Sequence, residues 1–283
     1  MNSITRLRCD LEYAIFADTH FCFNIQASRR GDQRVLEESL LVTPGIQVRQ
    51  FEDPNNGNRF FRCDGIAGTL KVRYDAAIEM SRSAPDQSLS ECSITDMPNE
   101  VLHYLLPTRY CQSDVMSRAA QHLFGHVAPG YQRVRHICDW IRENIAYQVG
   151  VSTPTTSAQD VYLQRAGVCR DYAHLAITFC RALNIPARLV VGYVHFEEPP
   201  QDFHATFEAL LGGQWVMFDP TKLAPVEAVV RVGTGRDAKD TAFATMFGMV
   251  SMTYMHIQVS HDGVPPSDNP DPREATVKRM VMA

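Results

Sequence analysis

The chain has 283 residues, of which 45% are hydrophobic and 21% are charged, and its formal net charge at pH 7 is −5. A chain of this length and apolar content is long enough to bury a sizeable core, as one large domain or as two. The mildly acidic balance and the lack of lysine- or arginine-rich runs argue against nucleic acid as a partner. We therefore expect a folded globular protein that does not bind nucleic acid.

Residues 1–108 are predicted to form an antiparallel β-sandwich domain. Apolar residues alternate with polar ones at Cys9, Leu11, Tyr13 and Ile15, which is typical of a strand with one buried face. Further strand-like runs, separated by turn-forming residues, cover 37–42, 46–52, 59–63 and 69–80. We expect this domain to pack against the part of the chain that follows it.

From residue 114 the apolar period changes from two to three and four, which predicts helices. Two helices are expected in 115–145, and a third, short helix is expected to open near Thr156. A fourth run, 168–183, carries apolar residues at helical spacing and is expected to end before Pro186. Cys169 therefore lies in the first turn of a buried helix.

Strands are predicted on the carboxyl side of this helix, at 187–194, 204–211 and 214–219. The dipeptide Gly212-Gly213 is a two-residue turn of the kind that tight hairpins prefer. If the hairpin closes there, paired residues have numbers that sum to roughly 425, by the register of a two-residue turn. His204 then lies two positions beyond the partner of Asp219, so the two side chains are expected to meet.

Cys169, His204 and Asp219 occur in the order expected for a thiol nucleophile, its base and the carboxylate that orients the base. A cysteine attacks as the thiolate, and an unperturbed thiol, with a pKa of about 8.5, is mostly protonated at neutral pH. The positive end of a helix and a nearby imidazole both favour the thiolate. The pattern therefore indicates nucleophilic catalysis by Cys169.

Three motifs resemble those of the bacterial transglutaminase-like superfamily: GVCRDYAH at 167–174, FHA at 203–205 and FDPT at 218–221. Segments 104–111 and 235–238 also resemble parts of these proteins, so the likeness covers nearly the whole chain. It includes the N-terminal β domain found in bacterial transglutaminase-like cysteine proteases. The resemblance implies an α+β protein whose papain-like core, helices packed on an antiparallel sheet, occupies 109–262.

By this resemblance Cys169 is the nucleophile, His204 the general base and acid, and Asp219 the orienting carboxylate. The thiolate of such enzymes attacks an amide carbonyl, and water or an amine resolves the thioester. We expect hydrolysis or deamidation of a peptide or small amide; amide-bond formation with an amine acceptor and a non-catalytic binding module are the alternatives. The tryptophan that animal transglutaminases use near the oxyanion has no clear match here, so the Cys169 N–H is the one donor named and the second is open.

Four further residues are candidates for the surroundings of the site. Asp171 and His174 belong to the cysteine motif and are expected to hydrogen-bond neighbouring loops more than to take part in chemistry. Arg236 and Asp237 lie in a glycine-flanked loop that is near the cleft in the resembled family. A solvated ion pair is the simpler interpretation of an adjacent Arg and Asp, and both interpretations stay open.

No metal or other cofactor is expected. His122 and His126 have the i, i+4 spacing of metal ligands on a helix, but no third ligand is apparent, and no calcium-loop pattern occurs.

The eight cysteines are scattered, which favours free thiols in a reducing compartment. Without an apolar leader or a membrane-length apolar stretch, the expectation is a cytoplasmic protein with no membrane partner. Residues 263–283, rich in proline, are predicted to be a mobile tail; the oligomeric state is left open.

Overall fold

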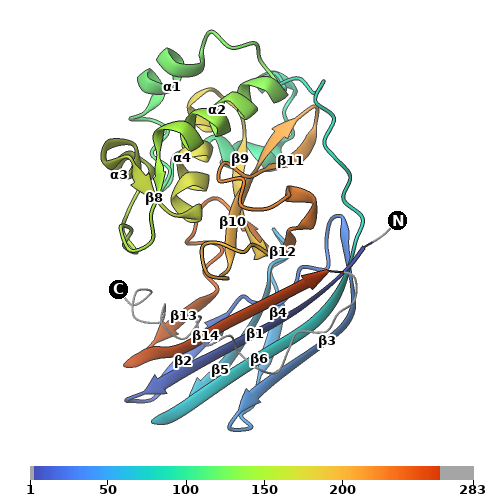
Figure 1. Cartoon of the computed structure of the whole chain (residues 1–283), viewed down its shortest axis with the longest axis vertical. Helices are drawn as coiled ribbons and strands as arrows, with labels where there is room; N and C mark the ends of the chain where they lie inside the picture. Colours follow the sequence, from blue (N-terminus) through green and yellow to red (C-terminus); the bar gives the residue numbers. More distant parts are fainter. Residues whose placement is uncertain (1–2, 262–283) are drawn as a thin grey trace.

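The computed structural model describes residues 3–261; the tail predicted to be mobile lies outside the described residues. The described chain is an α+β structure in which a β-sandwich domain lies against a domain of helices and a smaller sheet, called here the helix–sheet domain (Figure 1). The predicted fold class is confirmed.

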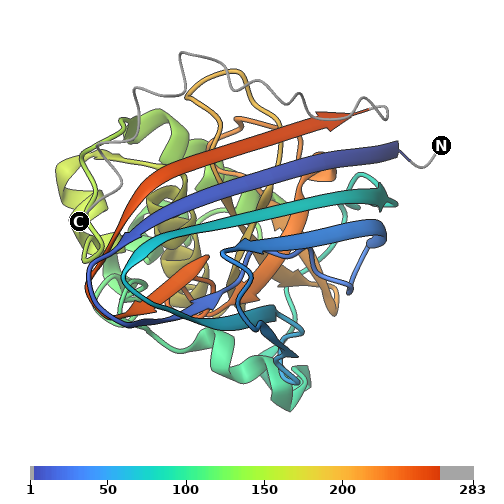
Figure 2. The same ribbon diagram turned by 90° about the horizontal axis from the view of Figure 1, so that it is seen from below.

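The β-sandwich domain consists of two four-stranded antiparallel sheets. Long strands lie side by side in the first sheet, in the order β14-β1-β6-β3 (Figure 2). The second sheet has the order β13-β2-β5-β4. The strand bounds are β1 Ser3–Ile15, β2 Thr19–Phe23, β3 Gln33–Thr43, β4 Arg49–Glu52, β5 Arg59–Gly65, β6 Gly68–Met80, β13 Ala244–Phe247 and β14 Val250–His261. The alternating apolar residues of β1 are buried between the two sheets, as the period of two predicts.

The sandwich differs from the predicted boundaries, which assigned everything from 109 to 262 to the second domain. Strand β13 pairs with β2, and β14 pairs with β1 along its whole length. The last strands of the chain therefore belong to the N-terminal sheets. Local patterns do not reveal this because the pairing joins residues more than two hundred positions apart, such as Leu7 and Val259.

The helix–sheet domain contains the helices α1 Ser117–Phe124, α2 Tyr131–Asn144, α3 Ala158–Gln164 and α4 Cys169–Ala182. Three-residue and seven-residue 3₁₀ helices, Ile94–Asp96 and Asn99–Leu105, lie on the link from the sandwich, and a third covers Val226–Ala228. Helix α4 is the centre of the domain: Tyr172 through Arg181 are all buried, and the other helices and the sheet pack around it. A helix buried on all sides is positioned by packing, so its first turn is held in place.

The sheet of this domain has the order β11-β10-β9-β12, all antiparallel. Its bounds are β9 Ala187–Tyr193, β10 His204–Leu211, β11 Gln214–Phe218 and β12 Val230–Gly235. Leu211 pairs with Gln214 and Phe207 with Phe218, which is the predicted hairpin register. His204 at the start of β10, the end of β11 and the end of β9 therefore lie together at one end of the strands of this sheet.

A short strand pair and an apolar contact between the two domains complete the fold. The two-residue strands β7 (Ala146–Tyr147) and β8 (Ala166–Gly167) pair in parallel directly before α4. The apolar core of the sandwich also includes Tyr193, Phe203 and Val230 from the other domain, so the two domains pack together through apolar side chains. Among residues 3–261, no helix has the length and apolar character needed to cross a membrane.

Candidate active site

Cys169 is the first residue of α4 and is half-buried, whereas the residues from Asp171 to Arg181 on the same helix are buried. The first N–H groups of a helix have no acceptor within the helix and point outward at its positive end. A thiolate at this position is therefore stabilised by the helix, and a carbonyl approaching its sulfur meets the Cys169 N–H. The predicted position of Cys169 in the first turn agrees with the structure.

His204 and Asp219 are in contact, as the hairpin register predicted. His204 Nε2 lies 2.9 Å from Asp219 Oδ2, and both side chains are almost fully buried. The other carboxylate oxygen, Oδ1, accepts hydrogen bonds from the N–H and the hydroxyl of Thr221 at 2.9 and 2.7 Å. Thr221 thus fixes the carboxylate so that Oδ2 is presented to the imidazole.

The other ring nitrogen of His204 is not bound by Asp219. Nδ1 is buried and has no hydrogen-bond partner among residues 3–261, and the Cys169 side chain also interacts with the imidazole. Burial alone would lower the pKa of His204, but the hydrogen bonds and charges of Asp219 and Cys169 outweigh it and raise the pKa to about 10. His204 therefore holds its proton at neutral pH, as an imidazolium between a carboxylate and a sulfur.

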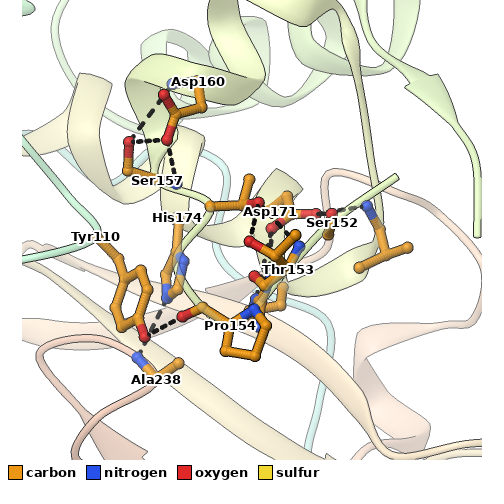
Figure 3. A network of polar contacts seen from close by, with 12 residues as sticks. Tyr110, Ser152, Thr153, Pro154, Ser157, Asp160, Asp171, His174 and Ala238 are labelled. Atoms are coloured by element: carbon orange, nitrogen blue, oxygen red, sulfur yellow. Dashed lines mark hydrogen bonds and ion pairs between the residues drawn. The ribbon is translucent and has the colours of Figure 1, made fainter. Parts of the chain in front are cut away.

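Asp171 supports the turn that carries Cys169 (Figure 3). Its buried carboxylate accepts a 2.9 Å hydrogen bond from the N–H of Val168 and a short one from the Ser152 hydroxyl. Arg170 donates to the other carboxylate oxygen at 3.2 Å. A carboxylate at the third position of a helix that binds the N-cap N–H closes the helix start. The structure thus places Asp171 behind the nucleophile, bound to a neighbouring loop.

Replacing Asp171 with alanine is expected to lower the free energy of unfolding by about 2–4 kcal/mol, because the partly buried Val168 N–H and Ser152 hydroxyl lose their buried acceptor. Asp160→Ala is the matched control: Asp160 is also the third residue of a helix and binds the N–H of Ser157, but it is exposed. Its loss is expected to be about 1 kcal/mol. Urea unfolding of both variants measures the difference, and equal losses would contradict the role assigned to Asp171.

His174, one turn further along α4, is fully buried, and within the described part of the chain it has no hydrogen bond to His204 or Asp219. Its Nε2 accepts a 3.1 Å hydrogen bond from the N–H of Ala238, and its ring stacks on Tyr110 at 5.1 Å (Figure 3). Burial, with the charges of Arg170 and Arg181, holds the pKa of His174 well below its usual value, so the ring is neutral. His174 thus ties α4 to two loops.

Arg236 and Asp237 lie at the other end of the strands of this sheet from His204. Arg236 is exposed and pairs with Asp240 at 2.9 Å, while buried Asp237 accepts from the N–H of Lys239. Arg236 lines a hollow of about 510 Å³ with Trp215 and Arg188, between the two domains. Gly235 pairs with Leu189, whereas His204 pairs with Gly192 further along β9, so this hollow lies at the strand ends opposite to those that carry His204.

Sequence reasoning missed Asp202, two residues before His204. One of its carboxylate oxygens accepts a 2.6 Å hydrogen bond from the N–H of Phe203, and no ion pair involves it among the residues that the structure describes. Burial raises the pKa of Asp202 to about 6, although the hydrogen bond and the charge of His204 act in the opposite direction. The acidic loop 197–202 could have suggested a carboxylate here, but the pattern does not show which one turns inward.

The raised pKa of Asp202 predicts that Asp202→Asn stabilises the protein at neutral pH. A carboxyl group whose pKa is higher in the folded state destabilises that state when it is ionised. The destabilisation by Asp202 is therefore absent near pH 3, grows between about pH 4 and 6, and reaches its full size above pH 6. At pH 7 we expect Asp202→Asn to raise the free energy of unfolding by about 1–2 kcal/mol. This is less than the full pKa shift would give, because Asp202 is partly exposed to solvent. Urea unfolding across this pH range tests it, with exposed Asp18→Asn as control; a gain that does not depend on pH would contradict the account.

Tyr147 was also missed. It lies on β7 beside Gly167 of β8, and its hydroxyl interacts with both the backbone N–H and the side chain of Cys169. The sequence holds no signal for this, because two-residue strands leave no periodic pattern. Within residues 3–261 there is no group of three or more His, Cys, Asp or Glu side chains arranged to hold a metal ion. All eight cysteines are free thiols.

Comparison with known families gives two matches along the chain. A family model described as the transglutaminase-like superfamily matches residues 117–220, which include Cys169, His204 and Asp219. A second model, described as the bacterial transglutaminase N-terminal domain, matches residues 5–100, which form most of the sandwich. The two models agree with the two domains seen in the structure.

Individual proteins resemble the chain over much of its length. The crystal structure of a "Putative Cysteine Protease" from Cytophaga hutchinsonii is 39% identical, covers 95% of both chains and has a TM-score of 0.89. An uncharacterized protein of Mycobacterium leprae is 31% identical over 61% of this chain and 66% of its own length. An uncharacterized Mycobacterium tuberculosis protein is 29% identical over 74% of each chain. These matches are consistent with a papain-like cysteine enzyme.

Proposed function

Since the chain belongs to the bacterial transglutaminase-like superfamily, we propose that it is a cysteine-dependent enzyme that cleaves or deamidates an amide in a peptide-like substrate. The observation that carries the proposal is the buried His204, which is bonded through Nε2 to Asp219 and also interacts with the Cys169 side chain. Asp219 binds one ring nitrogen of His204, and the other, Nδ1, is available to the thiol.

The proposed reaction uses these groups in order. The Cys169 thiolate attacks the amide carbonyl carbon, a C–S bond forms, and the carbonyl π electrons move to oxygen. When the intermediate collapses, the C–N bond breaks and His204 gives its proton to the departing nitrogen. Water then attacks the thioester while His204 takes one of its protons, and the acid and the thiolate are released. Asp219 holds the ring in place and stabilises its positive charge throughout.

Two observations support hydrolysis of a peptide-like amide over other acyl transfers. The related Cytophaga hutchinsonii protein carries the name "Putative Cysteine Protease". Cys169 is also only half-buried, so water can reach the thioester. An amine acceptor would give amide-bond formation instead, and the experiment separates the two products.

Incubation of the protein with a library of glutamine-containing peptides, with and without a primary amine, tests the proposal. We expect cleaved or deamidated peptides in both samples, detected by mass, and none with Cys169→Ala. Products that contain the amine would instead show amide-bond formation. Absence of all products from a wild-type protein whose Cys169 is readily alkylated would refute a peptide-like substrate.

A further inference from the structure

The proposed reaction needs two hydrogen-bond donors for the oxyanion, and the Cys169 N–H supplies one. Removing a single such donor from an enzyme typically costs about 10²–10³ in rate, so the second donor is a large part of the mechanism. It must be a polar hydrogen that reaches the space in front of the Cys169 N–H, and it must belong to an element held rigidly against α4.

Strand β7 brings such a group to this place. The pairing of β7 with β8 puts Tyr147 beside Gly167, two residues before the nucleophile. The pairing is fixed by backbone hydrogen bonds on both sides of Tyr147, from Ala146 to Arg165 at 2.8 Å and from Gln148 to Gly167 at 2.9 Å. The Tyr147 backbone therefore keeps a set position relative to Cys169.

The ring of Tyr147 is oriented by packing. It is half-buried against the helical core and lies 5.7 Å from the ring of Tyr172, at an angle of 53°. Its hydroxyl then lies near both the N–H and the sulfur of Cys169. Burial and the negative charge of the Cys169 thiolate raise the pKa of Tyr147, while the Cys169 N–H acts in the opposite direction. The hydroxyl is therefore protonated at neutral pH and can donate.

We propose that Tyr147 is the second oxyanion donor, in the role for which the sequence offers no tryptophan. In the free protein its hydroxyl lies against the Cys169 N–H. When the carbonyl enters, its oxygen takes the N–H, and the Tyr147 hydroxyl donates to the same oxygen as the C–S bond forms and negative charge develops there. No proton leaves Tyr147, and the hydrogen bond is strongest in the tetrahedral intermediate.

The test compares two reactions of the same thiol. Acylation of Cys169 by p-nitrophenyl acetate passes through an oxyanion, whereas alkylation by iodoacetamide displaces iodide without one. Tyr147→Phe removes only the hydroxyl and keeps the ring that packs on Tyr172. We expect the ratio of acylation rate to alkylation rate to fall about 10²-fold. Tyr162→Phe is the control, because that tyrosine packs on Trp140 and Phe179, away from Cys169, and the ratio should not change.

The inference rests on the proposed function, and the two can fail separately. An unchanged ratio in Tyr147→Phe, with Cys169 still alkylated selectively, would overturn the role of Tyr147 alone. A ratio that rises would also overturn it, because the hydroxyl would then block the carbonyl site. If wild-type Cys169 is not alkylated selectively, the proposed function itself is wrong, and the oxyanion role falls with it.

Discussion

Replacing Cys169 with alanine is expected to abolish acyl transfer, with a loss of at least ~10⁴-fold, because no other group in the site can form the thioester. The measurement is the release of nitrophenolate from p-nitrophenyl acetate, in which the wild-type protein should give a burst of one equivalent. The fold should be kept, since Cys169 lies at the half-buried start of α4 and packs only at the margin of the core around this helix.

Cys180→Ala is the matched control for this prediction. Cys180 lies on the same helix and is fully buried among apolar side chains, and burial raises its pKa, so it does not ionise at neutral pH. Its replacement should lower stability through the lost packing but leave the burst intact. A burst that survives in Cys169→Ala, or disappears in Cys180→Ala while that variant stays folded, would contradict Cys169 as the nucleophile.

Asp219→Asn is expected to lower the acylation rate by about 10³–10⁴-fold while the fold is retained. Thr221 donates two hydrogen bonds to Oδ1, so the amide oxygen of the new asparagine takes that position and its NH₂ group faces His204. The ring must then accept at Nε2 and carry its hydrogen on Nδ1, toward the sulfur. In this tautomer the neutral ring cannot take the thiol proton.

The same variant should change the pH dependence. Without the Asp219 charge and hydrogen bond, two of the causes that raise the pKa of His204 are lost, so this pKa should fall from about 10 toward its ordinary value. Alkylation of Cys169 by iodoacetamide near pH 6 should slow accordingly. Asp139→Asn is the control, because Asp139 pairs with Lys222 at the surface. A rate within about threefold of wild type for Asp219→Asn would contradict the orienting role of the carboxylate.

Much of the site could be predicted because it is built from local patterns. The apolar spacing of 168–183 and the proline that follows place Cys169 at a helix start. A two-residue glycine turn fixes the register of its hairpin, and with it the contact between His204 and Asp219. The helix start and the hairpin turn depend on residues that are close together in the sequence, and backbone geometry favours both of them there.

The remaining features depend on contacts between distant segments. The pairing of β14 with β1 moves the end of the chain into the first sheet, and no turn or spacing signals it. Tyr147 meets Cys169 through a two-residue strand pair, which is too short to leave a pattern. Arg236 and Asp237 follow β12, whose direction relative to β9 decides at which end of the strands they lie. Such relations are set by the packed core as a whole.

Alkylation by iodoacetamide as a function of pH, followed by peptide mapping, tests the central claim most directly. Cys92 is an internal control. It is partly exposed like Cys169, but its sulfur accepts a hydrogen bond from the N–H of Gly213 instead of interacting with an imidazole. Burial raises the pKa of Cys63 and Cys111 to about 11, so these thiols should stay silent. We expect Cys169 to react at least ~10-fold faster than Cys92 near pH 6, as an activated thiolate does. Slow labelling of Cys169, at the rate of Cys92, would contradict the account.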